Sequence, residues 1–317
     1  MKSTRWAIWI VVTAIGIGGG LWGIYRVADP EQLDIDSSVR QSVQGEFASL
    51  SDGYTHYELA GPVNGRVVVL AAGFSVPYYI WDPTFASLAE AGFRVLRYDY
   101  YGRGYSDRPR IPYNDDLYVR QLDQLLNVLH ITGPIDLAGI SFGASVITSF
   151  ADRYPERVRS LVYFDPSIRR PHGTTLLASF PAAWSYLTAI FDERDWADSQ
   201  LDDFFRPERF PDWPARYREQ LRYKGFRRAR LSEFVTNARV DQGEQLKRVG
   251  EHPRPVFVIW GKQDRTVAFE ENEWFMKMLP HATLLAVESA GHLPQWEQPQ
   301  IVHPDLIRFL QGQIRGR

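Results

Sequence analysis

The sequence predicts an α/β fold, with a mostly parallel, eight-stranded sheet that helices cover on both faces. Short apolar runs rich in Val, Ile, Leu and Phe alternate with helical patterns along most of the chain. The apolar content of these runs suits strands that are buried on both faces. The length of 317 residues fits one such domain around a single core.

The expected elements follow one another in a regular order. The first two strands, Gly45–Leu50 and Tyr54–Ala60, form a hairpin around the Asp52-Gly53 turn. Six more strands are expected at Arg66–Ala72, Phe93–Asp99, Ile135–Ile140, Ser160–Phe164, Pro255–Trp260 and Thr283–Val287. Helical patterns lie at Pro83–Ala91, Asp115–His130, Ala144–Tyr154, Glu270–Leu279 and Val302–Gln313. Asp82 is expected to cap the first helix, with Pro83 at its first position.

One insertion breaks this alternation. From about Ser167 to His252 there is no strand pattern, and the segment is rich in Pro, Arg and aromatic residues. It is expected to form a helical lid between the sixth and seventh strands of the core. Within it a basic stretch, opposed by Glu219, comprises Arg216, Arg218, Arg222, Lys224, Arg227, Arg228 and Arg230. We expect a solvated helix face there; the alternative is a face that meets anionic headgroups.

The N-terminal segment differs from the rest of the chain. Trp6–Tyr25 carries no charge, and at about 1.5 Å per residue a helix of that length crosses a hydrocarbon core of roughly 30 Å. Lys2 and Arg5 precede it, and acidic residues follow. We therefore expect residues 1–28 to form a transmembrane anchor, 29–44 a linker, and 45–317 an extracytoplasmic catalytic domain. The alternative is a cleaved signal peptide and a secreted or periplasmic protein.

Composition excludes several classes of function. The chain has no cysteine, which rules out disulfides, thiolate metal sites and a cysteine nucleophile. The net charge of −2 gives no general attraction to nucleic acid. No histidine–carboxylate spacing suggests a metal site, and no phosphate-binding loop is present. We expect no cofactor, metal or nucleic acid partner, and the oligomeric state is not predicted.

Ser141 is the candidate nucleophile. It lies in Gly139-Ile140-Ser141-Phe142-Gly143, which follows an apolar strand and opens a helix. Acyl transfer needs an exposed hydroxyl on a sharp turn from strand to helix, and the two glycines permit the close backbone contacts of such a turn. Ser145 lies inside the helix, and Ser106 lies in a loop that no helix follows, so both fit this pattern less well.

A serine hydroxyl needs a base, and His292 is the best placed of the seven histidines. It follows the last strand and so reaches the sheet edge at which Ser141 is expected. The other six are expected on the surface or at helix ends: His56, His130, His172, His252, His281 and His303. Asp264, directly after a strand, is the expected partner of the base. Asp165, at the end of the preceding strand, is its rival.

These residues, in the order Ser, Asp, His, carry a family resemblance. From about Gly45 to its C-terminus the chain resembles the α/β-hydrolase family. Two further motifs match that family: Asp99-Tyr100-Tyr101-Gly102-Arg103-Gly104-Tyr105-Ser106 and Gly291-His292-Leu293-Pro294-Gln295-Trp296-Glu297-Gln298-Pro299. The resemblance implies a Ser141–His292–Asp264 triad. It also implies an oxyanion hole formed by the backbone N–H groups of Phe74 and Phe142.

The resemblance is strongest to small lidded esterases and monoacylglycerol lipases, with one departure. Ala72 stands where the family usually has a histidine before the glycine of the oxyanion loop. The loss of an imidazole there puts activity in doubt rather than the fold, because one misplaced oxyanion donor costs about a hundredfold or more in rate. Relatives that use an aspartate at the elbow, the haloalkane dehalogenases and epoxide hydrolases, are excluded by Ser141.

The function expected is hydrolysis of a carboxylic ester with an apolar acyl or alcohol part, through an acyl-enzyme. The expected substrate is a small-molecule or lipid-derived ester. A second possibility keeps the triad but uses it for hydrolysis of C–C or amide bonds, or for cofactor-free perhydrolysis. A third is a non-catalytic binding protein on a hydrolase fold, which only Ala72 favours. The fold alone does not separate these possibilities.

Overall fold

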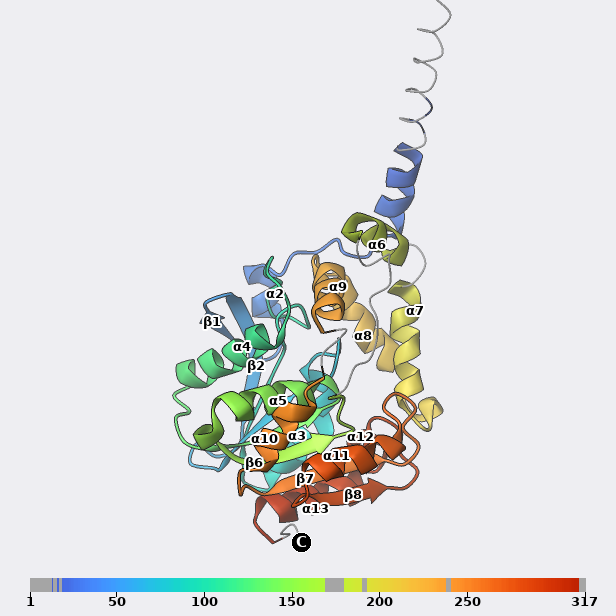
Figure 1. The fold of residues 1–317 in the computed structure, drawn as a ribbon. Coiled ribbons are helices and arrows are strands. Elements are labelled where there is room, and N and C mark those ends of the chain that lie inside the picture. Colours follow the sequence, from blue (N-terminus) through green and yellow to red (C-terminus); the bar gives the residue numbers. More distant parts are fainter. Residues whose placement is uncertain are drawn as a thin grey trace, which may run out of the picture.

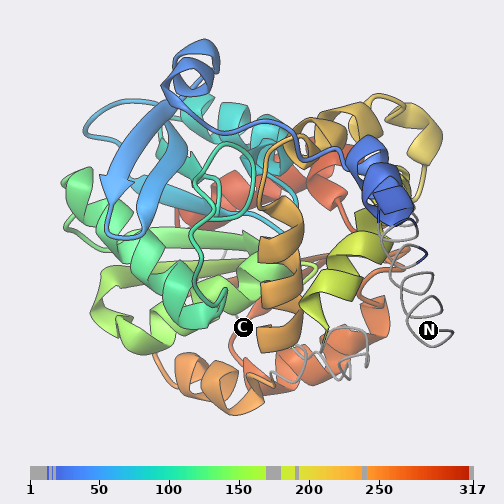
Figure 2. The same ribbon diagram turned by 90° about the horizontal axis from the view of Figure 1, so that it is seen from above.

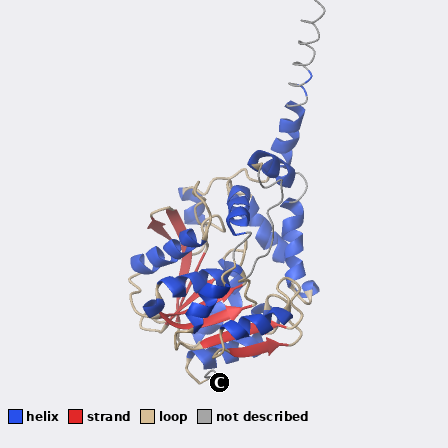
Figure 3. Cartoon of the chain, viewed as in Figure 1, coloured by secondary structure: helices blue, strands red, loops and turns tan. Residues whose placement is uncertain are grey.

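The computed structural model describes residues 13, 16, 19–168, 180–189, 193–237 and 241–313. These residues form an eight-stranded sheet in the order β1-β2-β4-β3-β5-β6-β7-β8 (Figure 3). The strands are β1 (Glu46–Leu50), β2 (Gly53–Ala60), β3 (Val67–Ala71), β4 (Arg94–Tyr98), β5 (Ile135–Ile140), β6 (Val158–Phe164), β7 (Val256–Gly261) and β8 (Thr283–Val287). β2 pairs antiparallel with β1 and β4, and all other neighbours are parallel. The predicted eight-stranded, mostly parallel sheet is confirmed.

The helices around the sheet form two groups (Figures 1 and 2). One consists of α4 (Asp115–Val128), α5 (Phe142–Arg153), α10 (Gly243–Gly250) and α11 (Asn272–Met278). The other consists of α3 (Asp82–Glu90), α12 (Pro294–Glu297) and α13 (Pro299–Leu310). Asp82 does not cap α3 as predicted, because Trp81 is the capping residue. The Asp82 carboxylate forms ion pairs with Arg97 and Arg216 instead.

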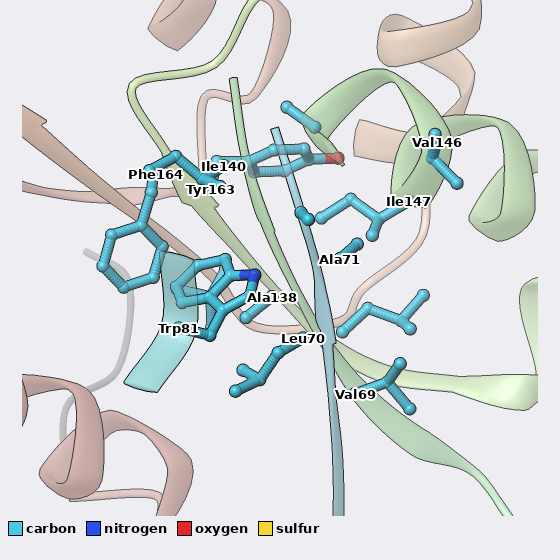
Figure 4. Close-up of a cluster of buried hydrophobic side chains, with 14 of the residues drawn as sticks. Val69, Leu70, Ala71, Trp81, Ala138, Ile140, Val146, Ile147, Tyr163 and Phe164 are labelled. Atoms are coloured by element: carbon cyan, nitrogen blue, oxygen red, sulfur yellow. The ribbon is translucent and has the colours of Figure 1, made fainter. Parts of the chain in front are cut away.

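The core lies where the central strands meet the helices. Every residue of β5 and of β7 is buried, as their continuous apolar sequences predict. Figure 4 shows Leu70 of β3 and Ala138 of β5 beside the ring of Trp81, which packs edge-to-face on Phe164 of β6. This packing fixes the strand ends from which the candidate site residues project.

The segment Ser167–His252, named here the insertion, connects β6 to β7. Its described part contains α6 (Pro181–Leu187), α7 (Glu193–Asp198), η5 (Ser199–Asp203), η6 (Pro207–Arg209), α8 (Trp213–Leu221), α9 (Phe226–Asn237) and α10. Figure 1 shows α6 to α9 projecting from the sheet, whereas α10 returns to it and packs on α5. The predicted helical character of this segment holds in its described part.

The prediction of a transmembrane helix over Trp6–Tyr25 is wrong on the evidence of the described residues. None of the helices they form is both long and apolar enough to cross a membrane. The continuous helical run there covers residues 19–28 and includes Arg26; it is about 15 Å long at 1.5 Å per residue. Residues 6–12, 14, 15, 17 and 18 lie outside the described residues. The predicted single-pass location, extracytoplasmic domain and membrane partner depended on this helix and are withdrawn.

Residues 29–34, which were expected to lie in a linker, pack on the insertion. The Glu31 carboxylate accepts hydrogen bonds from the N–H groups of Gly225 and Arg227. The Arg227 guanidinium forms an ion pair with Asp29, and its side chain is buried. Lys224 pairs with Asp34. The basic stretch is therefore not one solvated face: Lys224 and Arg227 pair with separate acids, and Arg228 donates to the backbone carbonyls of Arg108 and Pro109.

Candidate active site

Ser141 occupies the turn between β5 and α5. Its φ of 52° and ψ of −115° are strained for a residue with a side chain. A Cβ on Gly143 would lie 2.3 Å from the carbonyl oxygen of Ala71, and a Cβ on Gly139 would lie 2.5 Å from that of Gly143. Only glycine fits at both positions, so the motif permits the sharp turn that places Ser141 at the carboxyl edge of the sheet.

His292 and Asp264 meet at the same edge. His292 follows β8, Asp264 follows β7, and the imidazole Nδ1 lies 2.7 Å from Asp264 Oδ2. The other carboxylate oxygen of Asp264 accepts hydrogen bonds from the N–H groups of Thr266 and Val267 at 2.8 and 2.9 Å. One oxygen thus fixes the carboxylate to the backbone while the other orients the imidazole ring.

Ser141 lies at the carboxyl ends of the strands, as this pair does, but its hydroxyl makes no hydrogen bond to His292. Within the described part of the chain, the Ser141 hydroxyl has no hydrogen-bond partner, and the residue is partly exposed. Catalytic hydrogen bonds are often long or absent without substrate and tighten in the complex. The arrangement is compatible with a nucleophile and base that come into contact around a bound substrate.

Asp165, the rival acid, lies beside Asp264 and makes no hydrogen bond to His292 in the described structure. It is fully buried, and its Oδ1 accepts a hydrogen bond from Gly261 N–H, whereas Oδ2 has no partner. Burial raises the pKa of Asp165 well above its usual range, and the nearby charge of Asp264 raises it further. Burial and the neighbouring charge therefore favour the protonated form of Asp165, next to the carboxylate that holds the imidazole.

Asp165, Asp264 and His292 also form the one group, among the described residues, whose potential metal-ligating atoms lie within 4.8 Å of one another. Three of the potential ligand atoms, on His292 and Asp264, are already engaged. His292 Nδ1 and Asp264 Oδ2 bond to each other, and Asp264 Oδ1 accepts two backbone N–H groups. This donor set matches a hydrogen-bonded acid–imidazole pair better than a three-ligand cation site.

Of the predicted oxyanion residues, Phe142 directly follows Ser141 and Phe74 lies in the loop after β3. Phe142 is the first residue of α5, and the Phe74 and Phe142 rings pack edge-to-face with centroids 6.3 Å apart. No described residue accepts a hydrogen bond from Phe74 N–H. A Cβ on Gly73 would lie 3.6 Å from Ser141 Cβ, so the loop after β3 passes close to the candidate nucleophile.

Two residues of α8, which sequence reasoning missed, hold the oxyanion loop. The Tyr217 hydroxyl donates to Ser75 Oγ at 2.9 Å, and Gln220 Nε2 donates to the Ser75 carbonyl at 2.7 Å. Gln220 Oε1 also accepts a hydrogen bond from Gly104 N–H in the loop after β4. Ser75 is buried with a φ of 62°, so these contacts stabilise a strained residue. No motif marks Tyr217 or Gln220, and only the folded insertion brings them to this loop.

A second contact joins the insertion to the histidine loop. His292 N–H donates to the carbonyl of Asp203 at 2.7 Å. The buried Glu297 carboxylate accepts Gly291 N–H at 2.5 Å on one oxygen and Arg206 N–H at 3.0 Å on the other. Asp203 and Arg206 belong to the insertion, so it holds the segment that carries His292 as well as the oxyanion loop.

Replacing Glu297 by glutamine is expected to destabilise the fold by about 1–3 kcal/mol. Glutamine offers one acceptor oxygen where two backbone N–H groups need one each, and a buried unpaired donor costs about that much. Urea unfolding of Glu297→Gln measures the change. Glu270→Gln, at an exposed position, is the matched control and should leave the unfolding midpoint unchanged. Equal midpoints for Glu297→Gln and the unmodified chain would contradict this role.

The expectation that six histidines lie at the surface or at helix ends is wrong for two of them. His303 is buried, and this burial lowers its pKa to about 4. His56 is buried in β2, with Nδ1 2.8 Å from Asp99 Oδ2 and Nε2 2.7 Å from the Gln44 carbonyl. Both ring nitrogens face acceptors, an arrangement that favours the protonated imidazolium and raises the pKa of His56 despite its burial. Neither of the two family motifs indicates that His56, in the hairpin, pairs with Asp99, in the loop after β4.

Comparison with known proteins decides the family. The model of the Alpha/beta hydrolase family matches residues 68–304. The chain belongs to the alpha/beta hydrolase family. Among the relatives of this alpha/beta hydrolase is AB hydrolase superfamily protein YfhM of Bacillus subtilis, 25% identical, with 86% of this chain and 99% of that protein covered. Lipase 3 of a Moraxella species is 22% identical, and the alignment covers 79% of each chain.

Solved structures of other proteins share the alpha/beta hydrolase fold. A thermophilic esterase from Thermogutta terrifontis superposes with a TM-score of 0.72 at 22% identity. The superposition covers 85% of this chain and 99% of the esterase. At this identity the likeness shows the shared fold, and the reaction catalysed is a separate question.

Proposed function

We propose that this alpha/beta hydrolase cleaves carboxylic esters through an acyl-enzyme on Ser141. The observation that carries the proposal is the juxtaposition of a strained serine turn with an imidazole held by a buried carboxylate, at one edge of the sheet. His292 is assigned as the base, Asp264 as the residue that orients it, and the backbone N–H groups of Phe74 and Phe142 as oxyanion donors.

In this reaction Ser141 Oγ attacks the ester carbonyl carbon while His292 Nε2 takes the hydroxyl proton. The N–H groups of Phe74 and Phe142 stabilise the negative charge that develops on the carbonyl oxygen. The tetrahedral intermediate then collapses, and the leaving alcohol departs with the proton from His292. Water, deprotonated by the same imidazole, attacks the acyl-enzyme and releases the carboxylic acid and free Ser141.

Apolar surroundings support an ester with an apolar acyl or alcohol part. The Phe74 and Phe142 rings and the Ile80 side chain lie around the loop that passes Ser141. The insertion is assigned as a lid because it contacts both the oxyanion loop and the histidine loop. Relatives that are lipases, and an esterase of the same fold, agree with this assignment.

A series of p-nitrophenyl esters from acetate to decanoate tests the proposed activity, with matching p-nitroanilides for amide cleavage. We expect a burst of p-nitrophenol equal to the enzyme concentration. We also expect kcat/KM to rise with each added methylene, by up to about fourfold for full burial at 0.8 kcal/mol. Folded protein that turns over no ester, or that prefers the anilides, would reject ester hydrolysis.

The proposed base predicts a pH dependence. Burial lowers the pKa of His292, but the charge and hydrogen bond of Asp264 and the charge of Asp203 outweigh it and raise that pKa above its ordinary value. A base acts when neutral, so kcat/KM should rise with pH through a midpoint above about 6.5. In Asp264→Asn the midpoint should move to lower pH, because the charge of Asp264 is the main factor that raises the pKa of His292. A midpoint that the substitution leaves in place would contradict the pairing.

A further inference from the structure

A second cavity, of about 710 Å³, lies at the amino ends of the strands. Its lining includes Arg66, directly before β3, Arg159, the second residue of β6, and Arg254, two residues before β7. The parallel strands all have their amino ends on one side of the sheet and their carboxyl ends on the other. This cavity lies at the amino ends, and Ser141 lies at the carboxyl ends. β7 separates the two edges by about 20 Å at 3.3 Å per residue. The cavity is therefore distinct from the candidate active site.

The charged side chains in the cavity lining are all basic. Besides the three arginines the lining includes His252 and His281, and no aspartate or glutamate of the described part of the chain belongs to it. Beneath it the buried Asp136 carboxylate forms an ion pair with Arg66 and lies 3.5 Å from Arg159. One carboxylate thus balances part of the charge of two arginines and leaves the cavity electropositive.

Arg254 has hydrogen-bonding capacity that the protein does not use. Its Nε and Nη1 atoms are buried and have no hydrogen-bond partner among the described residues. Burial also lowers the pKa of Arg254, and the nearby Tyr163 and Glu156 oppose that shift without reversing it. Buried donors without acceptors are unfavourable and uncommon in folded proteins. No described carboxylate forms an ion pair with Arg254, so an anion in the cavity would offset the charge of its guanidinium.

The remaining walls are apolar. Pro255, Val256, Leu279 and Phe309 contribute to the lining, and the volume falls in the range of about 300–1,000 Å³ that is typical of small-molecule sites. We propose that this cavity binds a small amphiphilic anion, with a phosphate or carboxylate head on Arg254 and Arg159 and an apolar body against Leu279 and Phe309. This binding site is independent of the proposed ester hydrolysis.

Calorimetric titration of the full chain carrying Ser141→Ala tests the proposal without turnover. The probes are octyl phosphate, octanoate and inorganic phosphate. We expect one octyl phosphate or octanoate to bind per chain, at least tenfold more tightly than inorganic phosphate. The tighter of the two amphiphiles identifies the head group. Adding Arg254→Gln should weaken this binding at least tenfold, whereas adding Arg153→Gln, an exposed arginine on α5, should not change it.

The half-exposed Arg159 provides a second variant, should Arg254→Gln fail to fold. Arg159→Gln should weaken binding severalfold and reduce its dependence on salt. Amphiphiles that bind no more tightly than inorganic phosphate would overturn the proposal. So would unchanged affinity in the folded arginine variants, or an equal loss in Arg153→Gln. Because no reaction is measured, these outcomes are separate from a failure of the proposed ester hydrolysis.

Discussion

Asp264→Asn is expected to lower kcat for ester hydrolysis by about 10⁴-fold, as the equivalent change does in a serine protease triad. The amide would present an N–H group or a weaker acceptor to the imidazole, and the ring would lose its orientation and its stabilising charge. The loop should still fold, because asparagine keeps the oxygen that accepts the N–H groups of Thr266 and Val267. Steady-state kinetics with a p-nitrophenyl ester measure the loss.

Asp165→Asn is the matched control and is expected to change kcat less than tenfold. Asp165 is buried beside Asp264, which favours its protonated form, and asparagine resembles a neutral carboxylic acid in shape and polarity. Its oxygen can still accept the hydrogen bond from Gly261 N–H. Both variants should first give the circular dichroism spectrum of the parent. A larger loss of activity in Asp165→Asn than in Asp264→Asn would reverse the assignment of the acid.

Gly143→Ala is expected to destabilise the fold by more than about 3 kcal/mol, at the upper end of overpacking effects. The added Cβ would lie 2.3 Å from the Ala71 carbonyl oxygen and 2.6 Å from that of Ala72. Both are backbone atoms at the end of a central strand, so neither can move without distorting β3 or α5. The Ser141 turn and the oxyanion loop would shift together, and activity should fall with stability.

Gly133→Ala provides the comparison, since a Cβ there would meet nothing within 4 Å and the backbone is not in the left-handed region. This change should be neutral or stabilising by about 0.4–1 kcal/mol, through a less flexible unfolded chain. Urea unfolding of both variants measures the difference. Similar stabilities for Gly143→Ala and Gly133→Ala would show that the turn does not need its glycine.

The core of the fold was predictable because its strands carry their signal locally. Ile135–Ile140 and Thr283–Val287 have the predicted bounds, and the other strands shift by one or two residues at their ends. Continuous apolar runs bounded by polar loops need no knowledge of distant neighbours. The meeting of His292 with Asp264 also follows from position, since each comes directly after a parallel strand. The roles of these residues in catalysis stay predictions.

The features that could not be predicted from the sequence depend on contacts between segments that are far apart along the chain. The burial of His56 depends on Asp99, and the strained Ser75 depends on Tyr217 and Gln220 in the insertion. These are ordinary polar residues without local periodicity. The uncharged N-terminal segment predicted a membrane span, but the described run that continues it is short and contains Arg26.

The contacts of α8 also bear on the alanine at position 72. The Ala72 side chain cannot hydrogen-bond to the oxyanion loop. Gln220 links Ser75 in that loop to Gly104 in the next one, and Tyr217 bonds to the Ser75 hydroxyl. We infer that these two side chains help to hold the backbone N–H of Phe74 in position. A backbone donor needs a fixed loop rather than a particular side chain.

The most direct test of Ser141 as the nucleophile is to identify the residue that a fluorophosphonate probe modifies. We expect one adduct per chain, located by peptide mass spectrometry on Ser141. We expect no adduct in Ser141→Ala, and we expect labelling to be slower by orders of magnitude in His292→Ala. Full labelling of Ser141→Ala, or an adduct on another serine of the unmodified chain, would contradict the assignment of Ser141 as the nucleophile.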